Sequence, residues 1–313
     1  MSKYVFGVDI GGTTIKFGLF TVEGELIEKF AIDTDASDSG SKLLPDTAEA
    51  ILAKLKEKTL TIPDVVGVGV GVPGPVDEHG VVLVGVNIGW DKPVAVKASL
   101  SKLLGVAVTV TNDANIAALG ELWLGAAKGA HSAIMYTIGT GVGGGVIVDG
   151  KVINGINGAG GEIGHLMAVP EDGALCGCGK TGCLETVASA TGIARLAKAS
   201  LSASQAPSSL RQLEELTARD VFVAAKAGDA LALAVIDRVG YYLGLTAANL
   251  ATTTNPEKFI IGGGVSLAGD LLLNPIRKYY ELYAFSGVRA TPFVIATLGN
   301  DAGIVGGAYL AIH

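Results

Sequence analysis

A strand–turn–strand unit that occurs twice is the feature that most constrains how this chain can fold. In the first copy, the apolar residues 4–10 lead through a turn rich in glycine and threonine into the apolar residues 15–20. In the second copy, residues 133–138 lead through the turn 139–145 into residues 146–148. With 313 residues, the chain exceeds the usual size of a single core. The repeat and the length together predict two related α/β domains.

The first turn has the chemistry of a phosphate-binding loop. Its glycines let the main chain approach an anion, and its N–H groups and hydroxyls lie close together. Asp9, just before the turn, is placed to orient Mg²⁺. A tight glycine hairpin without a ligand is the alternative for this segment taken alone. Because the other half carries a second such turn, we expect the two domains to face each other across a nucleotide cleft. The residues of the first turn are Gly11, Gly12, Thr13, Thr14 and Lys16.

Composition argues against several classes of partner. The net charge is −7 and no block rich in lysine and arginine is present, so the footprint of a nucleic-acid-binding protein is missing. We expect no signal peptide, because the sequence runs straight into the first predicted strand, and no apolar stretch as long as a membrane span. Three cysteines within eight residues do not form a disulfide framework. The cytoplasm, a reducing compartment, is the expected location.

Hydrophobic spacing and turn residues predict the other elements. Residues 65–72 alternate valine and glycine, which predicts a buried strand with close backbone neighbours. Thr217 and Asp220 resemble a helix-capping box. Further strands are expected at 25–32, 106–111 and 259–261, and helices at 43–58, 94–104, 114–124 and 229–253.

The context of the second turn disfavours a dinucleotide-binding fingerprint. Gly139, Gly141 and Gly144 fit the G-x-G-x-x-G spacing. That fingerprint requires a helix after the glycines, whereas residues 146–151 predict a strand and a hairpin. The second turn is therefore interpreted as a phosphate loop of the same kind as the first.

A compact cysteine loop predicts a metal site. Cys176, Cys178 and Cys183 lie on a glycine-rich loop, and His165 precedes the first of them by eleven residues. Three thiolates and one imidazole form a closed tetrahedral set suited to structural Zn²⁺, which would order a loop with little core of its own. The alternative is three free cysteines in a loop.

Asp113 is the candidate general base. It lies at a predicted strand-to-helix junction, within Thr111-Asn112-Asp113-Ala114-Asn115. A sugar hydroxyl is a weak nucleophile, and a carboxylate in hydrogen-bond reach can take its proton as the bond to phosphorus forms. An aspartate at such a junction can instead cap the helix, and this alternative stays open.

Two glutamates flank the cysteine loop. Glu162 lies three residues before His165, and Glu185 follows Cys183 by two residues, so that bound zinc would hold it in place. Acceptors fixed beside a rigid loop could bind the hydroxyls of a polyol, and the histidine could turn its second ring nitrogen toward a ligand. Solvated or helix-capping glutamates are the alternative.

Taken together, these motifs resemble the ROK family of sugar kinases and repressors, in the actin-like ATPase superfamily. The resemblance covers essentially the whole chain, and within the family it is greatest to the glucokinases of Gram-positive bacteria. It implies two ribonuclease-H-like α/β domains around a nucleotide and sugar cleft: residues 1–115 with a returning helix at 301–313, and residues 116–300 with the zinc loop. Its most specific parts are residues 9–16, 112–115, 139–145 and 160–165 and the cysteine loop that ends in Glu185.

The resemblance also implies a role for each motif. Asp113 matches the catalytic base that deprotonates the sugar 6-hydroxyl, and Pro73-Gly74-Pro75, with Gly74 at its centre, matches a loop that flanks the sugar. The sugar ligands would be Asn87, Asn112, Glu162, His165 and Glu185. The ATP phosphates would lie on the first turn and on Thr140 and Gly141, and the adenosine on Gly262, Gly263 and Gly264. The zinc ligands would be His165, Cys176, Cys178 and Cys183.

The expected reaction is ATP-dependent phosphorylation of glucose at the 6-hydroxyl, with Mg²⁺ as the nucleotide's metal ion. N-acetylmannosamine, fructose, mannose and allose are alternative sugars, and polyphosphate is an alternative donor. A sugar-responsive repressor is disfavoured, because only three residues precede the first predicted strand and leave no room for a helix-turn-helix domain. The intact base and phosphate loops disfavour a non-catalytic sugar-binding protein. The resemblance further suggests a homodimer or a dimer of dimers.

Overall fold

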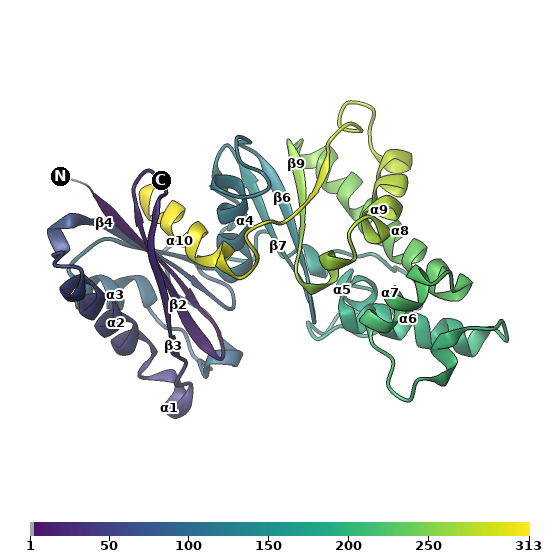
Figure 1. Ribbon diagram of the computed structural model, residues 1–313, viewed down its shortest axis with the longest axis horizontal. Helices are drawn as coiled ribbons and strands as arrows, with labels where there is room; N and C mark the ends of the chain where they lie inside the picture. Colours follow the sequence, from purple (N-terminus) through teal and green to yellow (C-terminus); the bar gives the residue numbers. More distant parts are fainter. Residues whose placement is uncertain (1–2) are drawn as a thin grey trace. The chain divides into compact units, whose positions relative to one another are not determined.

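The computed structural model describes residues 3–313, except for the side chain of Val86. It is an α/β structure built on two five-stranded sheets (Figure 1). Grouping residues by their mutual contacts divides the chain into two units. Unit 1 comprises Met1–His131, Gly145–Gly161 and Thr297–His313, and unit 2 comprises Ser132–Gly144 and Glu162–Ala296. The division into domains at residue 115 stays a prediction; the units differ from it in grouping residues 116–131 and 145–161 with the N-terminal part.

The first sheet contains the predicted N-terminal strands. β1 pairs antiparallel with β2 and parallel with β4, β2 pairs antiparallel with β3, and β4 pairs parallel with β5, which gives the order β3-β2-β1-β4-β5. The predictions for these segments are confirmed to within a few residues. The strands are β1 (Tyr4–Ile10), β2 (Thr14–Thr21), β3 (Leu26–Asp33), β4 (Val65–Val72) and β5 (Val108–Asn112).

Alternation along these strands gives the sheet two apolar faces. One face packs its main core against α2 (Leu43–Glu57) and α3 (Val96–Leu104), with Phe6, Val8 and Ile10 among the buried residues. On the other face, Val5 and Phe20 pack against α10 (Ala302–Ile312), which lies along the sheet (Figure 1). The C-terminal helix is therefore part of the same core as the N-terminal strands.

Glycines allow α10 to approach the sheet at backbone distance. A Cβ atom at Gly7 would lie 1.7 Å from the carbonyl oxygen of Ile304, and one at Gly69 would lie 1.8 Å from that of Gly307. Both distances are far below any real contact, so only glycine fits at these positions. The predicted close backbone neighbour of the Val/Gly strand is confirmed, and it is α10.

The second sheet repeats the plan of the first. Read as β8-β7-β6-β9-β10, its order matches β3-β2-β1-β4-β5, with β6, β9 and β10 parallel and β7 antiparallel to β8. The repeat seen in the sequence is therefore a repeat of topology. The strand expected at residues 146–148 is confirmed, but it begins earlier than expected, at Val142. The strands are β6 (Ala133–Ile138), β7 (Val142–Val148), β8 (Lys151–Val152), β9 (Lys258–Gly262) and β10 (Phe293–Ile295).

The remaining helices lie mostly in unit 2. The predicted capping box at Thr217 and Asp220 is confirmed. The α-helices are α1 (Ser37–Gly40), α4 (Asp113–Trp123), α5 (Glu185–Ala188), α6 (Ala190–Ala203), α7 (Ala218–Lys226), α8 (Ala230–Thr254) and α9 (Asp270–Tyr283). Short 3₁₀ helices occur at Ile62–Asp64, Val86–Ile88, Ile163–His165, Ser209–Gln212, Gly264–Ala268 and Gly299–Asp301.

Helix α8 corrects the expectation that the chain has no apolar stretch as long as a membrane span. This helix has 25 residues, and by length and composition it is long and apolar enough to cross a membrane, contrary to the expectation that no stretch reaches that size. Most of its apolar window is buried inside the protein. It packs closely against α9, where a Cβ atom at Gly240 would lie 2.2 Å from the Cβ of Pro275. A core helix passes the same test of length and hydropathy, so α8 is weak evidence for a membrane span.

Candidate functional site

The first glycine turn is braced by its own hydrogen bonds and by two neighbouring segments. The N–H of Gly11 donates to the carbonyl of Thr14 at 3.0 Å, and the Thr34 hydroxyl donates to the carbonyl of Gly11 at 2.6 Å. A Cβ atom at Gly12 would lie 2.9 Å from the carbonyl oxygen of Asn87. Gly12 and Thr13 are exposed. The turn is thus a fixed and accessible backbone surface, and the predicted sugar ligand Asn87 lies beside it.

Asp9 and Lys16 face each other on paired strands below this turn. They are register partners on β1 and β2, and their Oδ2 and Nζ atoms are 3.8 Å apart. Burial raises the pKa of Asp9, the charge of Lys16 opposes this, and the charge of Asp113 raises it further. A Cβ atom at Gly303 would lie 2.8 Å from the Asp9 carboxyl carbon, so the start of α10 is packed against this group. A partly buried carboxylate beside a glycine turn suits a hard cation such as Mg²⁺.

Asn112 caps α4, which leaves Asp113 for another role. The Asn112 side-chain oxygen accepts from the N–H groups of Ala114 at 2.8 Å and Asn115 at 3.4 Å. Asp113 is the first helical residue, and its Oδ1 accepts from Ala114 at 2.8 Å. Although its side chain reaches solvent, restricted solvation by the surrounding protein raises the pKa of Asp113 above its usual value. The helix is therefore capped by Asn112 and not by Asp113, which was the alternative role considered for Asp113.

The same asparagine fixes the Pro73-Gly74-Pro75 loop. Its Nδ2 donates to the Gly74 carbonyl at 3.2 Å. Gly74 has a positive φ of 105°, and a Cβ atom there would lie 2.0 Å from the carbonyl oxygen of Val84. Both observations require glycine. Asn112 thus uses its oxygen for the cap and one N–H for this loop.

A polar cluster beneath the Asn112–Asp113 turn was not predicted. Asn154 Oδ1 accepts from the Thr111 hydroxyl at 3.0 Å and from Asn115 Nδ2 at 3.1 Å. Thr111 and Asn115 are buried. The cluster ties the segment around Asn154 to both ends of the Thr111–Asn115 motif, so it stabilises the turn that carries the candidate base. The sequence predicted the Thr111–Asn115 motif but gave no indication that Asn154 contacts it.

Glu121 is a second residue that sequence reasoning missed. Its side chain is fully buried, and its two oxygens accept from the N–H groups of Ala126, Thr297 and Leu298 and from the Thr297 hydroxyl, at 2.7 to 3.3 Å. This carboxylate fixes the chain just before the segment that brings Gly303 against Asp9. The sequence feature that could have indicated its role is the position of a single glutamate on the apolar side of a predicted helix.

Unit 2 carries the second glycine turn. Its first N–H, at Gly139, donates to the carbonyl of Gly141 at 2.9 Å. The Gly139 carbonyl accepts from the N–H of Ala190 at 2.8 Å, and the Thr140 carbonyl accepts from the Thr191 hydroxyl at 3.2 Å. The N–H of Val142 donates to Glu185 Oε2 at 3.0 Å. This turn is therefore held by the segment that follows the cysteine loop.

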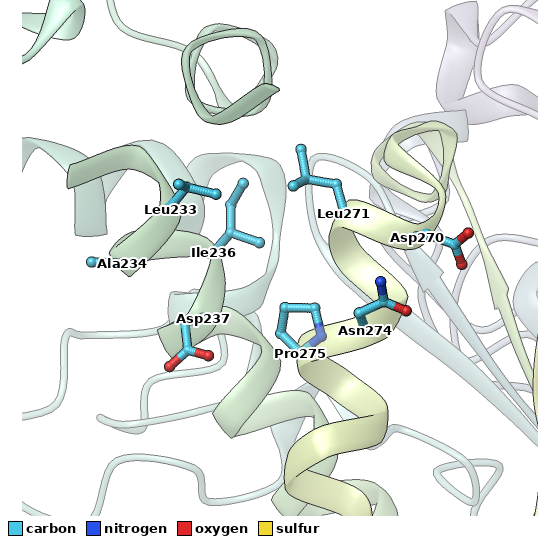
Figure 2. A pocket seen from close by; sticks show the side chains of 8 residues that line it. All are labelled: Leu233, Ala234, Ile236, Asp237, Asp270, Leu271, Asn274 and Pro275. Carbon is cyan, nitrogen blue, oxygen red and sulfur yellow. The ribbon is translucent and has the colours of Figure 1, made fainter. Parts of the chain in front are cut away.

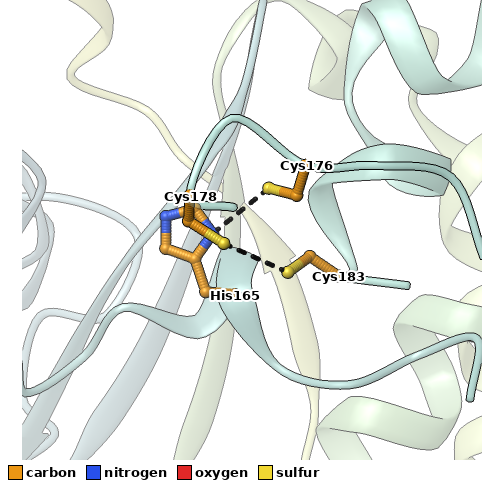
Figure 3. A group of neighbouring side chains, drawn as sticks. All are labelled: His165, Cys176, Cys178 and Cys183. Carbon is orange, nitrogen blue, oxygen red and sulfur yellow. Dashed lines mark hydrogen bonds between the residues drawn. The ribbon is translucent and has the colours of Figure 1, made fainter. Parts of the chain in front are cut away.

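The predicted metal ligands meet at one point of unit 2. The ligand atoms of His165, Cys176, Cys178 and Cys183 all lie within 4.8 Å of one another (Figure 3). The Sγ atoms of Cys178 and Cys183 are 3.6 Å apart, as are Cys176 Sγ and His165 Nδ1. A tetrahedral zinc ion with bonds of about 2.3 Å places its sulfur ligands about 3.8 Å apart, so this set has the size that zinc requires.

The thiol of Cys183 depends on a cation for deprotonation. Burial, together with the neighbouring thiols, raises the pKa of Cys183 to about 12. A bound cation reverses such a shift, because it favours the thiolate. Lys180 donates to the His165 carbonyl at 3.0 Å and closes the loop over the cluster. The donor set and its spacing therefore fit structural Zn²⁺ better than three free cysteines.

The other predicted residues of unit 2 lie in two places. Glu162 begins the short helix Ile163–His165, and its carbonyl accepts from the His165 N–H at 3.1 Å. Gly263, the first residue after β9, has a φ of 80°, and a Cβ atom there would lie 2.4 Å from the Ile138 carbonyl oxygen. Apart from its own chain neighbours, none of the residues described in the structure has an atom within 4 Å of a Cβ placed at Gly264. Gly262–Gly264 is thus packed against β6 on one side and open at its last residue.

A hollow on unit 2 lies apart from these residues. It has a volume of about 540 Å³ and opens between α8 and α9 (Figure 2). No predicted site residue lines it. The lining residues are Leu233, Ala234, Ile236, Asp237, Asp270, Leu271, Asn274 and Pro275.

Comparison with known proteins identifies the group to which this molecule belongs. A model of the ROK family matches residues 5–313. The chain belongs to the ROK family. The glucokinase of Halalkalibacterium halodurans, a member with a curated name, is 48% identical and covers 98% of this chain and 94% of its own length. The glucokinase of Thermotoga maritima is 37% identical and covers 97% and 96%.

A solved ROK structure agrees in fold. The ROK family glucokinase of Streptomyces griseus, in complex with glucose and AMPPNP, has a TM-score of 0.72 with this chain at 36% identity, and the match covers 98% of each chain. The predicted family, its glucokinase branch and the α/β fold class are therefore confirmed.

Proposed function

We propose that this protein transfers the γ-phosphoryl group of ATP to the 6-hydroxyl of glucose. The observation that carries the proposal is that Asn112 and Asp113 have different roles at the start of α4. Asn112 caps the helix, so the Asp113 carboxylate is not needed for capping and can accept a proton from the sugar. Asp9, Lys16 and the first glycine turn belong to the same unit as this base.

Asp113 is proposed to act as the general base. The sugar hydroxyl loses its proton to the Asp113 carboxylate as its oxygen attacks phosphorus in line with the leaving diphosphate oxygen. The raised pKa of Asp113 makes this carboxylate a stronger base than an ordinary aspartate. The hydrogen bond from Ala114 keeps it oriented at the helix start.

The phosphates are proposed to lie on the two glycine turns. Gly11, Gly12, Thr13, Thr14 and Lys16 would bind them from unit 1, and Thr140 and Gly141 from unit 2. Mg²⁺, when bound with ATP, supplies positive charge to the phosphate oxygens, and Asp9 is the residue that would hold it. Lys16 would balance the charge of Asp9 and of the transferred group.

The sugar and adenosine roles are proposed for the remaining predicted residues. Gly74, Asn87, Asn112, Glu162, His165 and Glu185 would surround the sugar, and Gly262, Gly263 and Gly264 would form the adenosine loop. The support for them is that Asn112 fixes Gly74, that Asn87 adjoins the first turn, and that Glu162 and Glu185 flank the metal-ligand cluster.

The cluster of His165, Cys176, Cys178 and Cys183 is proposed to hold structural Zn²⁺. All four positions of a tetrahedral ion are filled by side chains, which leaves none for a reacting water, so the ion would order the loop rather than take part in the chemistry. We further propose that the protein acts in the cytoplasm as a homodimer or a dimer of dimers, in keeping with its three clustered thiols and its family resemblance.

A coupled assay of ATP consumption with Mg²⁺ tests the proposal. Glucose, mannose, fructose and N-acetylmannosamine are compared, with Asp113→Ala as the control for chemistry. A clear preference for glucose, lost in the variant, supports it. Preference for another hexose keeps the reaction and changes the substrate. No turnover with any sugar, in protein shown to contain zinc, would reject ATP as donor, and polyphosphate would then be tried.

A further inference from the structure

Glu185 joins the metal-ligand cluster to the second glycine turn. Its Oε2 accepts the N–H of Val142 at 3.0 Å, and its Oε1 lies 3.7 Å from Cys176 Sγ. One carboxylate therefore touches a cysteine of the cluster through one oxygen and the proposed phosphate turn through the other. All of these atoms belong to unit 2.

The Glu185 carboxylate also lies close to the residue before Val142. A Cβ atom at Gly141 would lie 2.4 Å from Glu185 Oε2. A Cβ atom at Gly164 would lie 1.9 Å from the Val142 carbonyl oxygen. Gly164 precedes the cluster residue His165. Val142 is thus held on both sides of its backbone by segments that carry metal ligands.

The segment after Glu185 orients the peptide groups of the turn. The carbonyls of Gly139 and Thr140 accept from Ala190 and Thr191, respectively. In a trans peptide, the C=O and N–H groups point in opposite directions. The N–H groups of Thr140 and Gly141 therefore point away from this segment. Two neighbouring N–H groups aimed the same way form an anion-binding pair.

We propose that Glu185 is a positioning residue for the nucleotide, through which the state of the metal-ligand cluster sets the affinity for ATP phosphates. The inference rests on the proposed function and adds to it. The sugar-binding role proposed for Glu185 is kept, and the bond from Val142 adds a second role on the backbone of the phosphate turn. Metal bound to the cluster holds the loop and Glu185, and Glu185 holds Val142.

The test measures binding of AMPPNP with Mg²⁺ by titration calorimetry, without sugar. Under this condition a role confined to sugar binding changes nothing. Glu185→Ala removes the acceptor of the Val142 N–H, and we expect about a tenfold loss of affinity, the size of one hydrogen bond to a charged group. Glu185→Gln keeps an acceptor oxygen and should stay within about threefold of wild type. Glu171→Ala removes an exposed carboxylate from the segment between His165 and Cys176 and is the matched control.

Two further measurements address the coupling itself. Amide hydrogen exchange at Val142 should speed up in Glu185→Ala and, after removal of the metal by a chelator, in the wild type. Gly141→Ala should weaken AMPPNP binding in the wild type but much less in the Glu185→Ala background, because the clashing carboxylate is gone. Circular dichroism and metal content confirm that each variant is folded and loaded.

The outcomes separate this inference from the proposed function. Wild-type AMPPNP affinity in folded, metal-loaded Glu185→Ala would overturn it, as would additive effects of the Gly141 and Glu185 substitutions. If the wild type itself does not bind AMPPNP, ATP fails as the donor and the inference falls with it. In that case, exchange at Val142 still reports whether Glu185 couples the cluster to the turn.

Discussion

Burial and the charge of Asp113 both raise the pKa of Asp9, so the two carboxyl groups of unit 1 interact electrostatically. The pKa of Asp113 is itself raised by burial, while hydrogen bonds from Ala114 and Asn112 oppose the rise. Carboxyl groups whose solvation is restricted retain protons to higher pH than ordinary aspartates. The charge of the candidate base therefore contributes to the raised pKa of the candidate magnesium ligand.

The pH dependence of the reaction should show this shift. Because the base must be ionised, kcat/KM should fall on the acid side with an apparent pKa above the usual aspartate value of 3.8. Asn112→Ser keeps a good helix cap but removes the amide that lowers the pKa of Asp113, so the acid limb should move to higher pH. An unmoved or lower acid limb in that variant would contradict the assignment.

Asp113→Ala should separate chemistry from binding. Loss of a general base typically lowers the rate by about 10²–10⁴-fold. Glucose affinity, measured by tryptophan fluorescence or calorimetry, should change far less, because the other proposed ligands remain. Near-normal kcat in this variant would show that another group removes the proton.

Asp113→Asn should stabilise the protein without ligands at pH 7. The folded-state pKa of Asp113 is raised, so the stability gained from its protonation is present at low pH and is lost as pH rises through the folded pKa. At pH 7 the ionised group therefore opposes folding, and the amide removes that opposition. The melting temperature should rise by a few degrees at pH 7, and the gain should vanish near pH 3. An equal gain at both pH values would point to a cause other than titration.

Glu121→Ala should lower the free energy of unfolding by about 3 kcal/mol, because it leaves buried N–H groups without an acceptor. Urea denaturation measures this, and Glu23→Ala, at an exposed glutamate of the same unit, should be nearly neutral. The substitution should also weaken catalysis, since the segment held by Glu121 leads to Gly303 and Asp9. Equal stability of the two variants would show that the buried carboxylate is not needed.

Gly69→Ala should be more damaging than a typical glycine substitution. The new Cβ meets the backbone carbonyl of Gly307, so no side-chain rotation can relieve the clash and α10 must move. We expect a loss of several kcal/mol in unfolding free energy or an insoluble product. At Gly264 the new Cβ would contact no described residue other than its chain neighbours, so Gly264→Ala should remain folded and stable.

The sequence was informative wherever a local pattern determines the structure. The Val/Gly alternation of residues 65–72 predicted a close backbone neighbour, and the spacing of three cysteines with His165 predicted a cluster that the structure brings together. It could not choose between Asn112 and Asp113 as the helix cap, since both residue types cap well. The cap is Asn112 because its backbone is extended, whereas Asp113 is already helical.

Polar contacts between residues far apart in the sequence were not predicted, for a different reason. The bond between Glu121 and Leu298 joins residues 177 positions apart, and the bond between Val142 and Glu185 joins residues 43 apart. No periodicity or motif connects such pairs. Asn154 is similar, because only the fold brings it beneath the Thr111–Asn115 motif. These contacts orient the site, whereas the residues proposed to act in it are visible in the sequence.

The packing of α10 on the first sheet sets an order for folding during synthesis. Domains usually fold as they leave the ribosome, with the N-terminal one first. Here one face of the first sheet, including Gly7 and Gly69, has no cover until residues 302–312 have been made. Glu162–Ala296, the larger part of unit 2, emerges earlier and in one piece. The nascent N-terminal strands therefore expose an apolar surface until α10 has been synthesised. A chain released from a ribosome stalled near residue 300 would keep that surface exposed, so it would be prone to aggregate and would depend on chaperones.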